Sequence, residues 1–351
     1  MLINERPGVY SSIEIANPLR GTRANKVVGI TAVAENGEKG VCTRITSFGE
    51  AVSLYGADSS LTRLIRLMFL NGAFAIEATP AAVGADAELG DYIAAFKVLM
   101  EKESVTIMTC DSTLQAVHIA MREAIEDGSE NTKHRIGIVE GSECINAALD
   151  QAQAINHERI VMVYPGIEGG NGAFAAVGLV AAAFAGVLAQ GGDPALPLNG
   201  VELLGLDGFF RVFSDAEITK LVRAGITPIE SSGGRNSIVR GITTRTKTAG
   251  ELDNTWRELT TVLVIDHVVT SVRSALRLRF PRAKNTAQTR GAIRTQVIIE
   301  LQNKLKQEII AEYGEVSAAS DPSDPTVCIV NFEFTVAHGL NRIRLMASIS
   351  V

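Results

Sequence analysis

The glycine-rich stretch GIEGGNGAFAA, at residues 166–176, has the residue types most suggestive of chemistry. A glycine-rich loop that leads into a helix is the general form of a phosphate-binding site, because backbone N–H groups then point at the anion. The pattern is incomplete: Gly172 is followed by Ala175 rather than by a third glycine, and no Lys-Ser/Thr pair follows, as it would in a P-loop. One hypothesis is therefore a cytoplasmic α/β enzyme that binds a nucleotide or a phosphorylated substrate at Gly169–Gly172.

No other set of residues has the spacing of a catalytic or metal site. The five histidines are scattered without an HExxH motif, and the four cysteines lie far apart without a CxxC pair. No serine lies in a GxSxG elbow. Pairs of carboxylates such as Glu101 and Glu103 occur in charged runs that are typical of a solvated surface. We therefore predict no catalytic residues, no cofactor and no metal ion.

The composition is that of a folded globular protein. Of the 351 residues, 46% are hydrophobic and 21% are charged. The first residues, MLINERPGVY, lack the basic region and apolar core of a signal peptide, and we expect synthesis in the reducing bacterial cytoplasm. The uncharged stretch Gly169–Gly192 is rich in alanine and glycine, which favours a buried helix over a membrane span. No membrane partner is predicted.

The elements that would position these residues begin with a small α/β unit. From Lys26, two strand-like runs are joined by a glycine-containing turn at 36–38. Helices then begin near Ser47 and Ser59, and a short strand follows at 76–80.

Strands and helices alternate regularly through the middle of the chain. The predicted strands are 105–110, 135–141 and 159–165, and the helices between them lie near 113–127 and 143–156. This order predicts a central, mostly parallel sheet with helices on both faces. Chemistry would be expected at the carboxyl ends of its strands.

The last third of the chain has a different character, with long helices and then strands. Apolar residues near helical spacing predict helices at 254–280 and 287–313, and a polar loop follows at 317–325. This part is expected to form an α+β domain.

Both ends of the chain carry runs of period two, which predict strands. Such residues are Val9, Ser11, Ile13 and Ile15 near the start, Phe332, Phe334 and Val336 in the first closing strand, and Ile343, Leu345, Ala347 and Ile349 in the second. The second closing strand stays apolar to the terminal carboxylate, although chain ends usually fray unless something holds them. Each terminal strand either packs on its own domain or is an arm lent to another copy of the chain.

Charge is unevenly distributed. The whole chain has a net charge of −6, yet Thr270–Lys306 contains nine basic residues and one acid, Glu300, a local charge of +8. This basic face suggests an acidic partner, unless it is simply a solvated surface. A nucleic-acid-binding protein is a third functional hypothesis, but aromatic residues interleaved for base stacking are absent, and an acidic protein surface suits the pattern better.

Several segments together resemble one known family. They are PGVY near the start, VVGITAVAENGEKGVCTRITSFGEAVSLYG, LNGAFAIEATP, DPALPLNG, AGITPIESSGGRNSIVRGITTRT, WRELTTVLVIDHVVTSVRSALRLRF and the two closing strands. In order and spacing the chain resembles the sheath proteins of contractile injection machines, which include phage tail sheaths, contractile bacteriocin sheaths and related secretion-system sheaths.

The resemblance implies a structural role without catalysis. Sheath subunits of this kind stack as hexameric rings around an inner tube, and their arms add strands to sheets in neighbouring subunits. The central domain of the family is subtilisin-like by fold only. The implied partners are other copies of the chain, the inner tube protein, and the baseplate and tail terminator proteins, but not nucleic acid. The chain would be assembled in the bacterial cytoplasm and become part of a virion tail or a released contractile particle.

The resemblance also assigns expected roles to residues. The arms would be Val9–Ile15 and Ile343–Ile349, and Phe332, Phe334 and Val336 would lie in the acceptor strand. Glycine tolerates large changes of φ and ψ, so Gly21 and Gly339 are the expected hinges. The basic residues expected to face an acidic tube are Arg273, Arg277, Arg282, Arg290 and Arg294.

We predict five parts in the chain. They are an N-terminal arm (1–21), a small α/β unit (22–90), a central α/β domain (91–205), a C-terminal α+β sheath domain (206–340) and a C-terminal arm strand (341–351).

Overall fold

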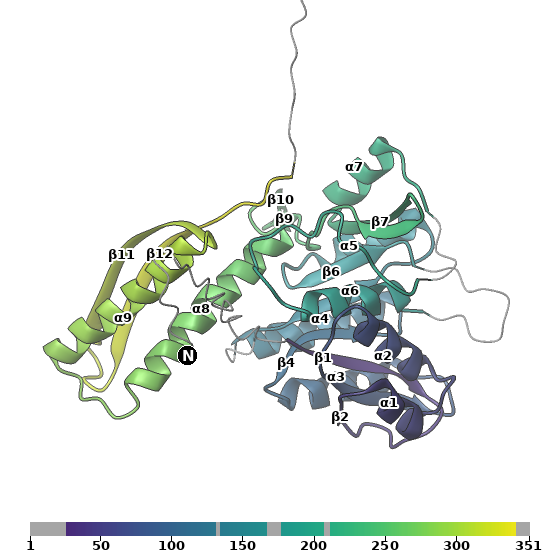
Figure 1. Ribbon diagram of the computed structural model, residues 1–351, viewed down its shortest axis with the longest axis horizontal. Coiled ribbons are helices and arrows are strands. Elements are labelled where there is room, and N and C mark those ends of the chain that lie inside the picture. The colour runs from purple at the N-terminus through teal and green to yellow at the C-terminus, as the bar shows by residue number, and fades with distance from the viewer. Residues whose placement is uncertain (1–25, 131–133, 167–176, 207–210, 342–351) are drawn as a thin grey trace, which may run out of the picture.

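The computed structural model describes residues 26–130, 134–166, 177–206 and 211–341. Within these ranges the helices and strands fall into a main body and a smaller C-terminal body (Figure 1). The main body contains β1 (Val27–Ala34), β2 (Thr43–Ile45), α1 (Phe48–Tyr55), α2 (Ser60–Leu70), β3 (Ile76–Val83), α3 (Leu89–Glu101), β4 (Val105–Cys110), α4 (Gln115–Glu130), β5 (Ile136–Glu140), α5 (Ile145–Ile155), β6 (Ile160–Tyr164), α6 (Leu179–Ala189), α7 (Asp215–Arg223), β7 (Ile226–Ser232), β8 (Arg235–Ile238), β9 (Lys247–Thr248) and β10 (Glu251–Leu252). The C-terminal body contains α8 (Leu259–Arg279), α9 (Ala287–Lys306), β11 (Ile310–Ser320) and β12 (Cys328–Val336).

The main body is built on one eight-stranded sheet with the order β2-β3-β1-β4-β5-β6-β7-β8. The six inner strands run parallel, and only the edge strands β2 and β8 pair antiparallel with their neighbours. The prediction of a central, mostly parallel sheet is therefore confirmed. Strands from both sides of residue 90 belong to this sheet, so the predicted small unit and central domain share it.

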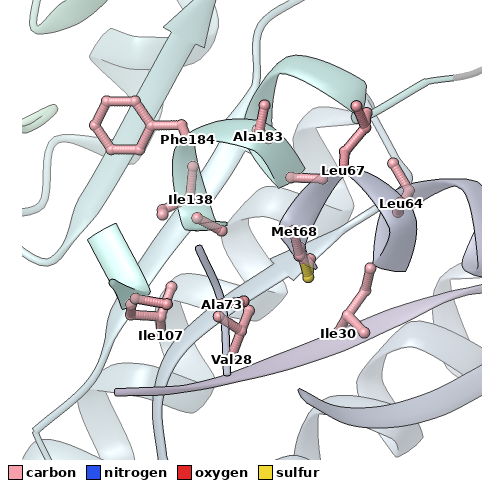
Figure 2. Packing of buried hydrophobic residues seen from close by; sticks show 14 of the residues in the cluster. Val28, Ile30, Leu64, Leu67, Met68, Ala73, Ile107, Ile138, Ala183 and Phe184 are labelled. Carbon is pink, nitrogen blue, oxygen red and sulfur yellow. The ribbon is translucent and has the colours of Figure 1, made fainter. Parts of the chain in front are cut away.

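Helices cover both faces of this sheet. One apolar cluster joins the sheet to α1, α2, α6 and the start of α8, and a second joins its other face to α3, α4, α5 and α7. Figure 2 shows part of the first cluster, where Met68 of α2 and Ile30 of β1 meet beneath α6, and Phe184 of α6 lies near Ile138 of β5. All four of these side chains are fully buried.

Helix α6 explains the stretch rich in alanine and glycine. Nine of its eleven residues are buried, and it packs tightly against α2. A Cβ atom on Gly186 would lie 2.6 Å from the carbonyl oxygen of Met68, so only glycine permits this approach. The interpretation as a buried helix is therefore confirmed for residues 179–189 of this stretch. Alanine and glycine are required here because two helices and a sheet meet at short range.

The two strand-like runs after Lys26 are present but are not neighbours. Strand β3 lies between them, pairing parallel with β1 and antiparallel with β2. The turn sequence indicated the chain reversal correctly, with Gly37 at φ 105°. The pairing itself depends on β3, more than thirty residues later, which local sequence does not reveal.

The C-terminal body corrects the predicted helix at 287–313. Helix α9 ends at Lys306, Glu308 takes a left-handed conformation with φ 58°, and β11 begins at Ile310. Strand β11 pairs antiparallel with β12, and its register shifts between Tyr313 and Val316. This irregularity breaks the period of two, so β11 lacks the alternation that marks β12.

Helix α8 belongs to both bodies. Leu259, Val262 and Leu263 are buried in the main core, whereas Val264, Val268 and Val272 are buried in the core of the C-terminal body. It is also the one helix of the described residues that is long and apolar enough, by composition alone, to cross a membrane. Its burial in two protein cores accounts for that composition.

Arg159, next to β6, holds the middle of α8 through both of its terminal nitrogens. They donate to the carboxylate oxygens of Asp266 at 2.8 and 2.9 Å. Such bidentate pairs are geometrically specific, so this contact fixes α8 against the main sheet.

Candidate functional site

At the carboxyl ends of the parallel strands, where an enzyme of this fold would hold its substrate, Asp111 and His118 contact other groups of the same chain. Asp111, after β4, accepts hydrogen bonds from the Tyr92 hydroxyl at 2.6 Å and the Val33 N–H at 2.8 Å. His118 lies 2.7 Å, through Nε2, from the Ser112 carbonyl oxygen, and burial lowers its pKa to about 4. These groups hold loops and helices in place.

Glu140, at the end of β5, is a fully buried carboxyl group of this region. It accepts backbone hydrogen bonds from Gly178, Val180 and Ala181, so it caps the start of α6. Burial raises its pKa to about 7, although these three donors act in the opposite direction. A buried carboxylate that is fully used as a helix cap is not free to act on a substrate.

The glycine-rich stretch 166–176 is described by the structure only at Gly166. Gly169–Gly172 lie outside the described residues, and so do most of their neighbours. Across the described ranges, no group of three or more His, Cys, Asp or Glu side chains could hold a metal ion.

The C-terminal body presents the most unusual surface of the molecule. Strands β11 and β12 form a separate two-stranded sheet, from Ile310 opposite Val336 to Ser320 opposite Cys328. Among the described residues neither strand has a partner on its other edge. A two-stranded sheet is marginal on its own and exposes rows of unpaired backbone groups.

The inner face of this sheet is covered unevenly. Ile310 and Val316 of β11 are buried, at 1% and 3% exposure, against α8 and α9. The predicted acceptor residues Phe332, Phe334 and Val336 alternate along the same face of β12, but all three are only half-buried. The rings of the two phenylalanines stack with centroids 6.2 Å apart. The apolar surface therefore continues to the edge of β12 that has no partner among the described residues, and it is only partly covered there.

The predicted tube-facing arginines fall into two groups. Arg290 donates to the Asn285 side-chain oxygen at 2.9 Å, and Arg294 Nε donates to the Val316 carbonyl at 2.7 Å. These two arginines fasten α9 to the rest of the body. Arg273, Arg277 and Arg282 are exposed. Within the described ranges, the last two form no ion pair or side-chain hydrogen bond.

The two layers of the C-terminal body carry opposite charges. The segment 307–341, which contains the sheet, has six acidic residues and no lysine or arginine. Three of these acids, Glu312, Glu315 and Glu333, are exposed on the strands, and no ion pair of theirs occurs in the part of the chain that the structure describes. The helices that cover the inner face are basic, so this small body is strongly polarised.

The chain leaves β12 along a fixed path. A Cβ atom on Gly339 would lie 2.6 Å from Pro197 Cγ, so this glycine permits a close packing contact. The Asn199 side-chain N–H then donates to Asn341 Oδ1 at 2.8 Å. Residues 339–341 are thereby held against the main body. A hinge role for Gly339 remains a prediction.

The remaining predicted residues lie outside the described part of the chain. They are Val9, Ser11, Ile13, Ile15, Gly21, Ile343, Leu345, Ala347 and Ile349. Sequence reasoning missed β11 and the anchor at 197–199. The only local signal for β11 was the pair Tyr313 and Val316 around Gly314, and the anchor had none, because Asn199 and Asn341 are 142 positions apart.

Comparison with known proteins agrees with this architecture. Residues 85–244 match the model of the phage tail sheath protein central domain, and residues 251–350 match that of the phage tail sheath C-terminal domain. The tail sheath protein of Bacillus phage SP01 is 26% identical over 257 residues, which are 70% of this chain. The chain spans 43% of the length of that relative.

Solved structures share the fold over nearly the whole chain. The contracted helical sheath of the anti-feeding prophage is similar with a TM-score of 0.73 and 17% identity, over 99% of this chain and 100% of the other. A chain in the six-fold symmetrised baseplate of the same particle is similar with a TM-score of 0.72 and 17% identity, over the same shares.

The two matching models together span most of the chain, and the central domain is followed by the C-terminal domain. The chain belongs to the phage tail sheath protein family. This family is one of structural sheath proteins without enzymatic activity, and the chain matches its central and C-terminal domains.

Proposed function

We propose that this subunit polymerises as stacked hexameric rings around an inner tube, and that strands exchanged between copies link the rings. The observation that supports strand exchange best is the two-stranded sheet of β11 and β12, whose outer edges have no partner strand among the described residues and whose inner face is half-covered beside β12. Backbone bonds to an added strand and burial of its apolar face would complete this sheet.

Strand exchange would keep neighbours connected while their bodies rotate. A strand of about seven residues offers a handful of backbone hydrogen bonds, each worth roughly 0.5–1.5 kcal/mol. One arm is then a modest tether, but several arms on each subunit raise the effective affinity greatly. The extended sheath would be a metastable state, and contraction would repack ring against ring and drive the tube through a target envelope without nucleotide hydrolysis.

The inner tube is the proposed partner of the exposed basic surface. Arg273, Arg277 and Arg282 are solvent-exposed on or just beyond the end of α8, and they suit an acidic protein surface. The similarity to a chain of the anti-feeding prophage baseplate supports baseplate contact at one end of the sheath. A terminator protein would close the other end.

The decisive experiment compares the full chain with a variant that lacks residues 342–351, by negative-stain electron microscopy of each protein alone. Long hollow tubes from the full chain and only small particles from the truncated chain are the expected result. At a concentration too low for assembly both proteins should unfold at the same temperature, since the truncation removes nothing from the described cores and association no longer stabilises the full chain. Tubes from the truncated chain would contradict strand exchange by the C-terminal arm.

A further inference from the structure

The two bodies meet along a contact that the loop 193–199 helps to form, and we call this contact the joint. Ala195 of this loop packs on the core of the C-terminal body, and Pro197 lies against Gly339. The Asn199 side chain donates to Asn341. On the side of the C-terminal body the joint contains the middle of α8 and the last turn of α9, which lies beside α8 (Figure 1). The joint therefore helps to decide how the C-terminal body is held on the main body.

A histidine and two lysines lie together at the joint. The His267 ring, on α8, approaches Lys304, on α9, with 2.8 Å between Nε2 and Nζ. Lys26, directly before β1, belongs to the main body and lies close enough to act on the charge of His267, as does Asp193. His267, Lys304 and Lys26 are half-buried, whereas Asp193 is exposed. The two bodies therefore place two amines around one imidazole that is partly shielded from water.

The contact between His267 and Lys304 depends on which nitrogen atoms carry protons. A lysine ammonium has three N–H donors and no acceptor, and a neutral imidazole has one ring nitrogen that accepts. Lys304 therefore donates to Nε2 of His267 only while that nitrogen keeps its lone pair. A proton on Nε2 would leave two donors facing each other at 2.8 Å, and the hydrogen bond would be lost.

The acids around the joint are engaged elsewhere. Three of them lie near His267 or Lys304, and each is already used within the fold. They are Asp266, held by Arg159, Glu300, which accepts from Gln296, and Asp193, which accepts from the Ala195 N–H. A proton on His267 would therefore add a positive charge beside two lysines, at a half-buried place where a charge is poorly solvated.

The electrostatics at His267 have the corresponding sign. Burial, Lys304 and Lys26 lower the pKa of His267 to about 4 from its ordinary value of 6.5, and Asp193 acts in the opposite direction. A histidine released to solvent would regain its ordinary pKa. The closed joint is therefore fully favoured above pH 6.5, and this advantage is lost as pH falls from 6.5 to 4.

We propose that the joint is an acid-sensitive contact, in which a proton on His267 breaks the hydrogen bond from Lys304 and separates the middle of α8 and the last turn of α9 from the main body. Leu259 and Val262, at the start of α8, would stay buried in the main core, so the two bodies would remain connected. The C-terminal body could then move relative to the main body. The joint lies within one copy of the chain, so this inference does not depend on strand exchange.

Hydrogen exchange of backbone amides measures opening of the joint in the full chain, at a concentration too low for copies to associate. Division of each exchange rate by the rate of a free amide at the same pH gives the fraction of time that a segment is open. The informative segments are 264–272 of α8 and 297–306 of α9, while β4, β5 and β6 report on the main sheet. If His267 has a pKa of 6.5 in the open state, opening should rise about thirtyfold from pH 8 to pH 5.

Three variants assign the rise to its source. His267→Gln keeps an acceptor for Lys304 but takes no proton, and groups that titrate elsewhere contribute equally to it and to the wild type, so the thirtyfold rise should be the difference between the two proteins. Lys304→Gln removes one of the two amines and should give a smaller rise, because His267 then titrates closer to its ordinary pKa. His134→Gln is the matched control: the pKa of His134 is lowered by burial and by Arg159 and Arg273, and this variant should keep the full rise.

A rise in the wild type and in His134→Gln that is absent in His267→Gln would support the proposal. Identical pH profiles for the wild type and His267→Gln would overturn it, and so would a rise that His134→Gln abolishes. An equal loss of protection in α8, α9 and the main sheet would also overturn it, because the whole chain would then be unfolding. If His267→Gln fails to fold, Lys304→Gln decides, and a rise equal to that of the wild type would contradict the proposal. All of these measurements are made on single copies, so they are independent of whether the chain forms tubes.

Discussion

The two sheets of this protein differ in whether they are complete. The eight-stranded sheet has helices on both faces, and the carboxylates Asp111 and Glu140 at its strand ends are hydrogen-bonded within the fold. The two-stranded sheet has helices on one face, open edges and exposed carboxylates without ion pairs among the described residues. The first sheet contributes the larger buried core, and the second is the sheet for which we propose a role in joining subunits. Stability and assembly should therefore respond to different substitutions.

The largest expected contrast is between two phenylalanines. Phe184 of α6 is fully buried in the main core, and Phe184→Ala should lower the free energy of unfolding by about 3–5 kcal/mol. Phe334 is half-buried on β12, and Phe334→Ala should cost only about 1 kcal/mol in the chain that lacks residues 342–351. Denaturant unfolding of that truncated chain measures both values.

In the full-length chain Phe334→Ala should nevertheless abolish tube formation, because the apolar surface offered to an added strand is lost. Electron microscopy at matched concentrations checks this. Equal losses of stability for the two variants would mean that the sheets are not as different as their burial indicates.

Glu140 should make the free energy of unfolding depend on pH, with lower stability at higher pH. Its pKa is about 7 in the folded protein and ordinarily 4.5, so between these values the folded state keeps a proton that the unfolded state releases. The stabilising contribution is full below pH 4.5 and is lost as pH rises through 7, by about 3 kcal/mol in all.

The variant Glu140→Gln cannot titrate and isolates this contribution. The difference in free energy of unfolding between Glu140→Gln and wild type should shift in favour of the variant as pH rises from 5 to 8. Urea unfolding at several pH values measures it in the truncated chain, and His118 and His267 contribute equally to both proteins. Parallel curves for the two proteins would show that Glu140 does not titrate in this range.

Two arginines of the basic surface differ in their contacts: Arg294 is hydrogen-bonded within the subunit, and Arg277 is exposed to solvent. Arg294 donates to the Val316 carbonyl of β11, so Arg294→Ser should lower the free energy of unfolding by about 1–2 kcal/mol. Arg277 is exposed, and Arg277→Ser should change it by less than about 0.5 kcal/mol.

Both variants remove one positive charge, so a difference in stability between them reports the hydrogen bond. The double variant Arg277→Ser/Arg282→Ser should weaken co-assembly with the inner tube, and more so at low salt, because exposed charges are screened at high salt. Tube co-sedimentation over a salt series measures this. Binding that is independent of both the variant and the salt would exclude this surface as the tube contact.

The smallest expected effects concern two glycines. Gly339→Ala would force a contact with Pro197 and should loosen the exit of the chain, with a loss of stability of about 1 kcal/mol or less. Gly291→Ala lies in α9 with no atom close to the added methyl group, and it should stabilise by about 0.5–1 kcal/mol. Thermal unfolding of both variants checks the signs, and an unchanged melting temperature for Gly339→Ala would argue for a mobile hinge.

Much of the main fold could be predicted because its strands are continuous apolar runs between helices. The runs at 105–110, 135–141 and 159–165 became β4, β5 and β6. The position of β3 between β1 and β2 could not be predicted, since pairing of distant strands leaves no local pattern. Strand β11 was missed because the irregularity near Gly314 interrupts its alternation.

The candidate site, the sheet of β11 and β12, could be predicted only in part. The alternation of Phe332, Phe334 and Val336 identified one face of β12. That this face is only half-covered depends on how α8 and α9 pack beneath it, which sequence does not reveal. The hydrogen bond from Arg294 to the Val316 carbonyl could not be predicted, because Val316 lies on the strand that was missed.

Helix α8 has a mechanical consequence. It is one uninterrupted rod of 21 residues, about 30 Å long, whose N-terminal end is buried in the main core and whose middle is buried in the core of the C-terminal body and paired with Arg159. A pull on the small sheet therefore reaches the large sheet as torque on a lever, without passing through a compliant loop. Force delivered by a neighbouring copy would turn the whole subunit rather than bend it.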